Sequence, residues 1–209
     1  RLKPESLNIF KKKKLKIFSE KGERDLIGYV KDKNFSLKIL FVHARNAIDA
    51  LANSTADVAI SGKDLLFNSN TNIQQKIKLY KNLDFGHASL KIFRSIYWID
   101  CRSLLDVSEI AKNKPIKLIT KYRHLVENFL AEKNVRNVEV IDSNGATEIA
   151  VRINQASLVG DISSSGSTAA ANDLIELSDG LILKTSAAIM VSKKSYKRKE
   201  VQKFLKFIA

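Results

Sequence analysis

The chain has 209 residues, of which 44% are hydrophobic, and its 36 basic and 22 acidic residues give a net charge of +14. This length supports one large domain or two small ones with a real core, and the hydrophobic share is typical of a globular protein. No apolar run approaches the roughly 18 residues that cross a membrane, and no signal peptide is visible. The single cysteine, Cys101, excludes an internal disulfide framework and favours a reducing compartment. We therefore expect a cytoplasmic protein with no membrane partner.

Strand and helix patterns alternate along the chain. Amphipathic or capped helices are predicted over residues 5–18, 46–52, 124–133, 147–153 and 199–207, with a further helix beginning at residue 63. Apolar strands are predicted over residues 38–42, 58–60, 89–97, 116–120, 138–141, 158–162 and 187–191. Alternation of this kind is typical of an α/β fold, and we expect mixed, mostly parallel sheets.

The predicted strands fall into two groups, one before and one after the middle of the chain. We expect two α/β lobes, residues 1–87 with 180–209 and residues 88–179, and a ligand cleft between them. This is the two-lobe architecture of type II periplasmic binding proteins. Ligands of α/β folds bind at the carboxyl ends of strands. Polar residues follow the predicted strands at Arg45, 61–64, Asp84, 120–122 and 161–168.

The segment 160–172, which reads GDISSSGSTAAAN, is the most informative part of the chain. An apolar run leads into Asp161, a turn of small hydroxylic residues follows, and helix-forming alanines come next. Such a turn at a helix N-terminus offers free N–H groups and the positive end of the helix dipole, which suits a phosphate. An acid just upstream suits ribose hydroxyls instead, so the segment predicts a sugar-phosphate site. A serine-rich turn that caps a helix without any ligand is the alternative.

The net charge of +14 raises nucleic-acid binding as a second alternative. The basic residues, however, are spread over the whole chain, with clusters at 11–14 and 193–199, and aromatic residues do not alternate with these clusters as on a stacking platform. The cluster at 11–14 lies in a predicted amphipathic helix, where a solvated face explains it. An anionic substrate explains a positive chain as well as a polyanion does, so we expect no nucleic-acid partner.

Six segments share their order and spacing with one known family. They are residues 1–2 (RL), 56–64 (ADVAISGKD), 83–86 (LDFG), 118–122 (LITKY), 144–148 (NGATE) and 161–172. Together they resemble the short-form catalytic subunit of the ATP phosphoribosyltransferase family, the first enzyme of histidine biosynthesis. The resemblance covers nearly the whole chain, and segment 161–172 corresponds to the family's loop for phosphoribosyl-pyrophosphate (PRPP).

The chain departs from the family pattern at four places. The family's cysteine and arginine near residues 87–90 are absent, Arg123 stands where proline is expected, Asn46 replaces an aspartate, and 169–170 are alanines where the family has leucine and a basic residue. The departures at Ala88, Ser89 and Arg123 support one alternative, a degenerate paralogue that binds PRPP without turnover.

The resemblance implies transfer of the phosphoribosyl group of PRPP to a ring nitrogen of the adenine of ATP, with release of pyrophosphate. This chemistry needs positioned substrates and cations at the pyrophosphate rather than a covalent nucleophile. The implied roles are Arg24 and Arg45 at the pyrophosphate, Asp161 at the ribose, Ser164, Ser165, Gly166, Ser167 and Thr168 around the 5′-phosphate, Glu148 and Arg1 as further PRPP contacts, and Tyr122 and Lys63 at ATP. The structural alternatives are surface salt bridges for the arginines, a solvated Lys63, a core Tyr122 and a helix-stabilising Glu148.

The resemblance also implies the cofactor and the partners. Mg²⁺ is expected because PRPP and ATP are handled as magnesium complexes, and no dedicated protein metal site is visible in the sequence. A regulatory subunit resembling histidyl-tRNA synthetase is implied as the partner of a homodimer within a hetero-oligomer. The alternative function for a protein of this two-lobe architecture is a non-catalytic module that binds a solute or PRPP.

Overall fold

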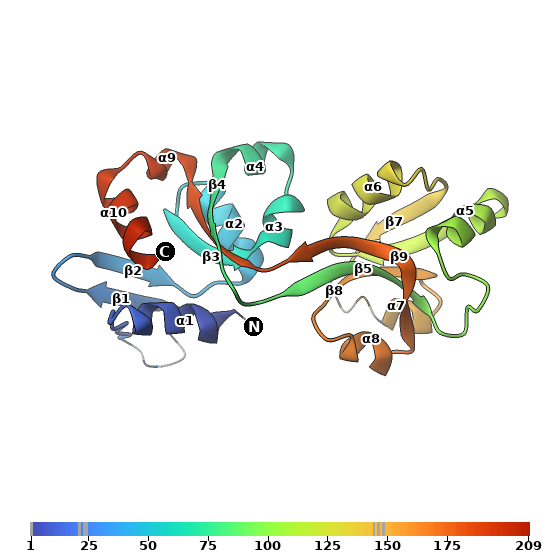
Figure 1. The fold of residues 1–209 in the computed structure, drawn as a ribbon, viewed down its shortest axis with the longest axis horizontal. Helices are drawn as coiled ribbons and strands as arrows, with labels where there is room; N and C mark the ends of the chain where they lie inside the picture. The colour runs from blue at the N-terminus through green and yellow to red at the C-terminus, as the bar shows by residue number, and fades with distance from the viewer. Residues whose placement is uncertain (1, 21, 23–24, 144, 146, 148) are drawn as a thin grey trace. The chain divides into compact units, whose positions relative to one another are not determined.

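The structure, a computed structural model, describes residues 2–20, 22, 25–143, 145, 147 and 149–209 (Figure 1). The chain divides into two compact units, each described by itself below. Unit 1 comprises residues 1–86 and 186–209, and unit 2 comprises residues 87–185. The return to unit 1 comes at residue 186 rather than at the expected residue 180, because the last strand of unit 2 runs on to Thr185.

Unit 1 is built around a three-stranded antiparallel sheet. Its order is β3 (Val58–Gly62), β10 (Ala187–Ser192) and β4 (Ile77–Asn82). All six residues of the central strand β10 are buried, as its continuous apolar run predicts. One face of the sheet packs against α2 (Ala44–Ala52), α3 (Lys63–Phe67) and α4 (Thr71–Lys76).

The other face of this sheet is covered by elements from both ends of the chain. These are α1 (Lys3–Lys12), the hairpin of β1 (Ile27–Lys31) and β2 (Ser36–Leu40), and α10 (Lys199–Ile208), which follows the short α9 (Lys193–Tyr196) (Figure 1). The apolar residues of α10 recur at helical spacing and are buried, namely Val201, Phe204, Leu205 and Ile208. The Phe35 ring of the hairpin lies 5.5 Å edge-on from the Phe204 ring and 5.0 Å from that of Phe207, which joins hairpin and helix.

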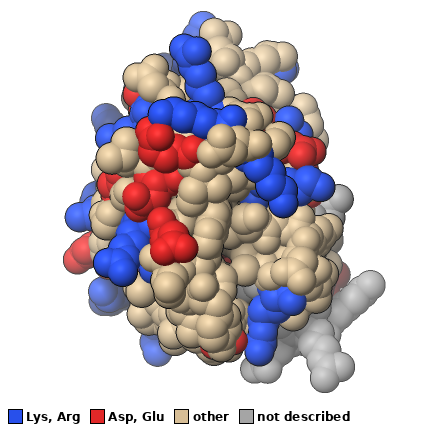
Figure 2. Space-filling model, turned by 90° about the vertical axis from the view of Figure 1, so that its right-hand side faces the viewer, with Lys and Arg blue, Asp and Glu red and all other residues tan. Residues whose placement is uncertain are grey.

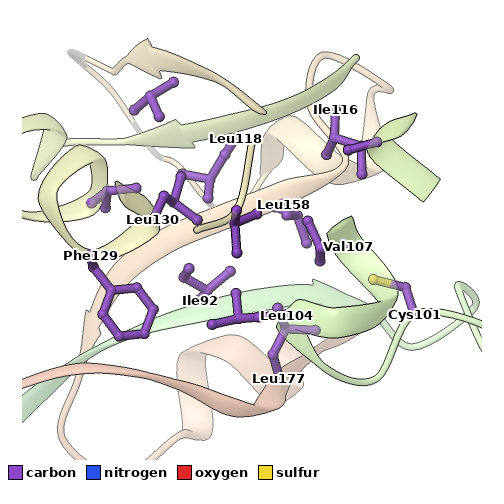
Figure 3. Close-up of a cluster of buried hydrophobic side chains, with 14 residues drawn as sticks. Ile92, Cys101, Leu104, Val107, Ile116, Leu118, Phe129, Leu130, Leu158 and Leu177 are labelled. Carbon is purple, nitrogen blue, oxygen red and sulfur yellow. The ribbon is translucent and has the colours of Figure 1, made fainter. Parts of the chain in front are cut away.

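Unit 2 is built around a five-stranded mixed sheet. Its order is β7 (Val138–Asp142), β6 (Ile116–Thr120), β8 (Leu158–Ser163), β5 (Ala88–Ser95) and β9 (Leu174–Thr185). The helices are α5 (Leu104–Asn113), α6 (Arg123–Glu132), α7 (Ile149–Arg152) and α8 (Ser167–Ala171). The main core lies between α5, α6 and one face of this sheet, where Leu118, Leu158 and Leu177 meet Leu104 and Phe129 (Figure 3).

The expected α/β fold with mixed sheets is confirmed, but the expected majority of parallel strands is wrong. In the described part of the chain, β6 pairs in parallel with β7 and β8, whereas the other five strand pairings are antiparallel. Parallel neighbours need a crossover, usually a helix, and α6 supplies one between β6 and β7. The antiparallel pairings join β1 with β2, β10 with β3 and β4, and β5 with β8 and β9.

Several elements differ from the sequence prediction. Strands β1, β4 and β9 and helices α4, α5 and α9 were not predicted. The first helix ends at Lys12 rather than residue 18, because Lys14 adopts a left-handed φ of 59° and the Leu15 N–H returns to the Phe10 carbonyl. None of the helices in the described ranges is long and apolar enough to cross a membrane.

Cys101 lies in the core of unit 2, fully buried (Figure 3). Burial, reinforced by the nearby Asp106 carboxylate, raises the pKa of its thiol from 9.0 to about 11. The raised pKa favours the protonated thiol in the folded state, so its contribution to stability is present below pH 9 and is lost as the pH rises towards 11. We expect no reaction with a thiol reagent such as dithionitrobenzoate at pH 8 until denaturant unfolds the protein. Rapid labelling of the folded protein would contradict this packing.

Candidate functional site

The candidate site in unit 2 begins where the parallel strands β6 and β8 end. The buried Thr120 lies beside Gly160, and its Oγ1 donates to the Gly160 carbonyl at 2.7 Å and accepts the Tyr122 N–H at 2.9 Å. A Cβ on Gly160 would lie 3.0 Å from a Val126 methyl and 3.1 Å from Thr120 Oγ1, so a side chain here would press on both neighbours. The two strand ends are thus held close together, with Tyr122 half-buried at the start of α6.

Asp161 follows directly, and both of its carboxylate oxygens are held. Thr147 Oγ1 donates to Oδ2 at 2.9 Å, and the Ile162 N–H donates to Oδ1 at 2.8 Å. Thr147 is fully buried, while Asp161 is half-buried. Asp161 therefore offers a carboxylate of fixed orientation, and acceptor oxygens of this kind suit the hydroxyl groups of a sugar.

The serine turn lies between Asp161 and α8, as the sequence predicted. Ser163 Oγ accepts the Gly166 N–H at 2.9 Å, and Gly166 adopts a left-handed φ of 80° just before the helix. The Oγ atoms of Ser165 and Ser167 lie 2.8 Å apart, Ser165 Oγ accepts the Ser167 N–H at 3.4 Å, and the N-cap residue of α8, Gly166, offers no side chain to cap the helix. Four side chains of this turn are exposed, namely Ser164, Ser165, Ser167 and Thr168. Hydroxyls and backbone N–H groups thus converge on one turn, a combination that suits a phosphate.

In unit 1, Arg45 and Lys63 lie at the starts of neighbouring helices. Arg45 is exposed in the first turn of α2, and Lys63 is the half-buried first residue of α3. The buried Ser61 donates from Oγ to the Ala44 carbonyl at 3.1 Å, which ties the end of β3 to the start of α2. The structure therefore brings these two predicted cations to the same end of unit 1.

The remaining predicted residues, Arg1, Arg24 and Glu148, lie outside the described residues. The described candidates form two sets, one in each unit, and the members of each set lie close together within their unit. Among the described residues, no group of three His, Cys, Asp or Glu side chains could hold a metal ion.

Two positioning residues were missed by sequence reasoning. Thr147 belongs to the segment NGATE and was not singled out, and its contact with Asp161 joins residues 14 positions apart. Thr120 was recognised only as a polar residue at a strand end. The signal for Thr120 was a hydroxyl directly after the apolar run of β6, whereas Thr147 gave no signal of its contact in the sequence.

Arg123, which stands where the family pattern has proline, has a structural explanation. Its Nε donates to Glu127 at 2.7 Å and its NH1 to Asp142 at 3.3 Å. These bonds link the first turn of α6 to the end of β7. Because the guanidinium donates hydrogen bonds to Glu127 and Asp142, its pKa is raised above its ordinary value, and Arg123 stays charged at physiological pH. The contacts that Arg123 makes therefore stabilise the surface of unit 2 where α6 begins.

Replacing Thr120 by valine tests the junction of β6 and β8. The change keeps the shape of the side chain but removes the hydroxyl that bonds Gly160 and Tyr122. We expect a loss of about 1–3 kcal/mol in the free energy of unfolding, because buried polar groups lose their partner. Urea unfolding monitored by circular dichroism measures this loss. The exposed Thr71 at the start of α4 is the matched control, and its replacement by valine should change stability by less than about 0.5 kcal/mol.

The fold places the chain in a known class. A chain from the "ATP phosphoribosyl transferase (HisG:HisZ) complex from Thermotoga maritima" matches 100% of this chain and 91% of its own length, with a TM-score of 0.75 and 19% identity. The P235GK mutant of ArgBP from T. maritima matches 82% of this chain and 68% of its own length, with a TM-score of 0.52 and 18% identity. The fold is thus the type II periplasmic-binding-protein fold, as the sequence predicted.

Sequence comparison gives the family within that class. The family model described as "HisG: ATP phosphoribosyltransferase" matches residues 44–209. The ATP phosphoribosyltransferase of Rhodopseudomonas palustris is 32% identical over 178 residues, which are 82% of this chain and 54% of the relative. That of Brucella suis is 27% identical over 209 residues, which are 97% of this chain and 90% of the relative. The chain belongs to the ATP phosphoribosyltransferase family, although it spans only about half the length of the R. palustris relative.

Proposed function

We propose that the chain is an ATP phosphoribosyltransferase, a pentosyltransferase that joins the anomeric carbon of PRPP to a ring nitrogen of the adenine of ATP. The bond from the anomeric carbon to the pyrophosphate oxygen breaks, and pyrophosphate leaves with the bonding electron pair. The products are phosphoribosyl-ATP and pyrophosphate, and the reaction opens histidine biosynthesis. Family membership supports the reaction, and the junction of Asp161 with the serine turn carries the assignment of the site.

The sugar phosphate binds in unit 2. Asp161, oriented by Thr147, accepts hydrogen bonds from the ribose hydroxyls. The turn from Ser164 to Thr168 surrounds the 5′-phosphate with N–H groups and hydroxyls, and the left-handed Gly166 lets the backbone approach the phosphate closely. Because the carboxylate and the turn are separated by a few residues of fixed structure, one ligand with a ribose and a phosphate satisfies both.

The cations of unit 1 act on the anionic groups of the substrates. Arg45 binds the leaving pyrophosphate with its planar guanidinium, and Lys63 binds a phosphate of ATP at the start of α3. Tyr122 packs against the adenine ring, since it is half-buried and its backbone is fixed by Thr120. Arg24, Arg1 and Glu148 remain assigned to the pyrophosphate and PRPP on the family resemblance alone. Positive charge near the leaving group stabilises the charge that develops there.

Magnesium enters as part of the substrates. Mg²⁺ binds phosphate oxygens together with only one or two protein ligands, so it needs no cage of side chains. The structural relative from T. maritima comes from a HisG:HisZ complex, which supports a second, regulatory subunit for this chain as well. We place the chain as a homodimer within such a hetero-oligomer in the cytoplasm.

A direct assay tests the reaction. The purified chain, alone and with the regulatory subunit of the same organism, is mixed with ATP, PRPP and Mg²⁺, and the ultraviolet absorbance of phosphoribosyl-ATP is followed. Turnover that depends on both substrates is expected. PRPP binding in calorimetry without turnover in either preparation would overturn the reaction in favour of a non-catalytic binding module. Failure to bind PRPP would overturn the site.

A further inference from the structure

The whole net charge of the chain belongs to unit 1. Residues 1–86 with 186–209 contain 24 basic and 10 acidic residues, whereas residues 87–185 contain 12 of each. Figure 2 views the molecule from the side of α5 and α6, and it shows acidic and basic side chains next to each other, as expected of a unit without net charge. Basic residues do occur throughout the chain, but the excess of basic over acidic residues lies in unit 1 alone. Because residues 87–185 of unit 2 lie between the two segments of unit 1 in the sequence, the difference in net charge between the units is not evident from the sequence alone.

A uniform compositional bias does not explain this difference. In unit 1, 20 of the 24 basic residues are lysines, whereas 7 of the 12 in unit 2 are lysines. A bias that acted on the chain as a whole would favour lysine and positive charge equally in both units. The lysines of unit 1 are thus a local property of this part of the fold.

Five of these lysines lie on one surface formed by three elements. Lys199, Lys203 and Lys206 follow each other on α10 at spacings of four and three residues, so they share one side of the helix. At the hairpin end, Lys203 Nζ lies 3.4 Å from Asn34 Oδ1 and 5.5 Å from the centre of the Phe35 ring. The residues that form this surface, here called the basic face, are Lys13, Lys33, Lys199, Lys203 and Lys206.

The other two members lie on the two elements beside α10, which are α1 and the β1–β2 hairpin. Lys13, at the end of α1, lies with its Nζ 5.5 Å from the centre of the Phe207 ring on α10. Lys33 is exposed at the hairpin tip beside Asn34. Among the described residues of unit 1, Arg198 pairs with Asp57 and Glu200, and no ion pair is found for a lysine of the basic face. Its ammonium groups therefore remain available for an external anion.

The basic face is separated from the substrate cations of unit 1. Helix α10, the hairpin and α1 cover one face of the sheet β3-β10-β4, whereas α2 and α3, with Arg45 and Lys63, cover the other. A sheet whose central strand is buried throughout lies between them. The basic face therefore has no role in holding ATP or PRPP at the proposed site.

We propose that the basic face binds the phosphate backbone of nucleic acid without reading the bases. Lysine binds phosphate as a point charge, and surfaces that bind nucleic acid are much more positive than those between proteins. The aromatic rings of this face are covered by lysines, with Phe35 buried and Phe207 half-buried, so they are not open to stack on bases. Protein interfaces are depleted in lysine and centred on exposed apolar anchors, which the basic face lacks.

Fluorescence anisotropy with a short labelled DNA duplex tests the proposal on the full chain. Five lysines at about −0.9 per phosphate predict a slope near −4.5 for log affinity against log salt, or about a 500-fold loss from about 50 to about 200 mM NaCl. Replacing Lys33, Lys203 and Lys206 together by glutamine removes three contacts. The slope should then fall to about −1.8, with only about a 12-fold loss over the same range.

The matched control replaces three exposed lysines of unit 2, Lys114, Lys117 and Lys133, by glutamine. Both triple variants carry the same net charge, so a slope that changes only in the first supports the basic face, with transferase activity unchanged in both. Equal loss in both variants, or no binding by the parent, would overturn the proposal. Tighter binding of poly-L-glutamate than of the duplex at equal charge would also overturn it, in favour of an acidic protein partner.

Discussion

Replacing Asp161 by asparagine should lower kcat/KM for PRPP by at least about a hundredfold while the protein stays folded. The asparagine keeps the size of the side chain but loses the charge, and one of its two terminal atoms becomes a donor. Both oxygens of Asp161 now accept hydrogen bonds, from Thr147 Oγ1 and from the Ile162 N–H, so the amide keeps the Ile162 contact through its oxygen and turns its NH2 group toward Thr147, whose hydroxyl then has to accept. The ribose would lose an oriented acceptor. Steady-state kinetics with varied PRPP measures the loss.

Asp173 provides the matched control for this change in the same unit. Its carboxylate pairs with Arg152 at 3.4 Å on the surface, and its left-handed φ of 56° is one that asparagine also adopts readily. Replacing Asp173 by asparagine should leave kcat/KM unchanged and alter the free energy of unfolding by less than about 1 kcal/mol. Equal kinetic losses in the two variants would remove Asp161 from the site. An unchanged KM and kcat in the Asp161 variant would do the same.

The elements that could be predicted from sequence are those whose apolar pattern is local. Strand β6 follows Pro115 as a short run rich in β-branched and aliphatic residues, broken only by the exposed Lys117, and was predicted with its observed bounds. Helix α10 repeats its apolar residues at helical spacing and was predicted to within one residue. Strand β9 was missed because Asp179 and Gly180 in its middle are typical of a turn. In the structure, the pairing of β9 with β5 shifts register there, and a Cβ on Gly180 would lie 3.0 Å from the Ile92 carbonyl oxygen.

The same distinction holds for the candidate site. The turn at 163–168 and the upstream Asp161 were predicted because the residues that bind phosphate and sugar lie next to each other in the sequence. The orientation of Asp161 was not, since its partner Thr147 reaches it only once β8 and the segment before α7 are folded together. The separation of charge between the units was also invisible, because it depends on residues 186–209 returning to unit 1. Contacts across the fold, rather than composition, decide these features.

Gly166 and Gly22 separate the role of the serine turn in folding from its role in binding. Both have left-handed φ angles, 80° and 82°, and a Cβ added to either meets no atom within 4 Å. Replacing either glycine by alanine should therefore cost a similar strain of about 1–2 kcal/mol in the free energy of unfolding.

Only the Gly166 variant should weaken PRPP binding, by about tenfold or more, because relief of the strain moves N–H groups away from the phosphate. Isothermal calorimetry with PRPP, together with urea unfolding of both variants, measures the two effects separately. Equal destabilisation with weaker binding in the Gly166 variant alone assigns the turn to the ligand. If binding is the same in both variants, the left-handed glycine serves only the start of α8, and the phosphate lies elsewhere.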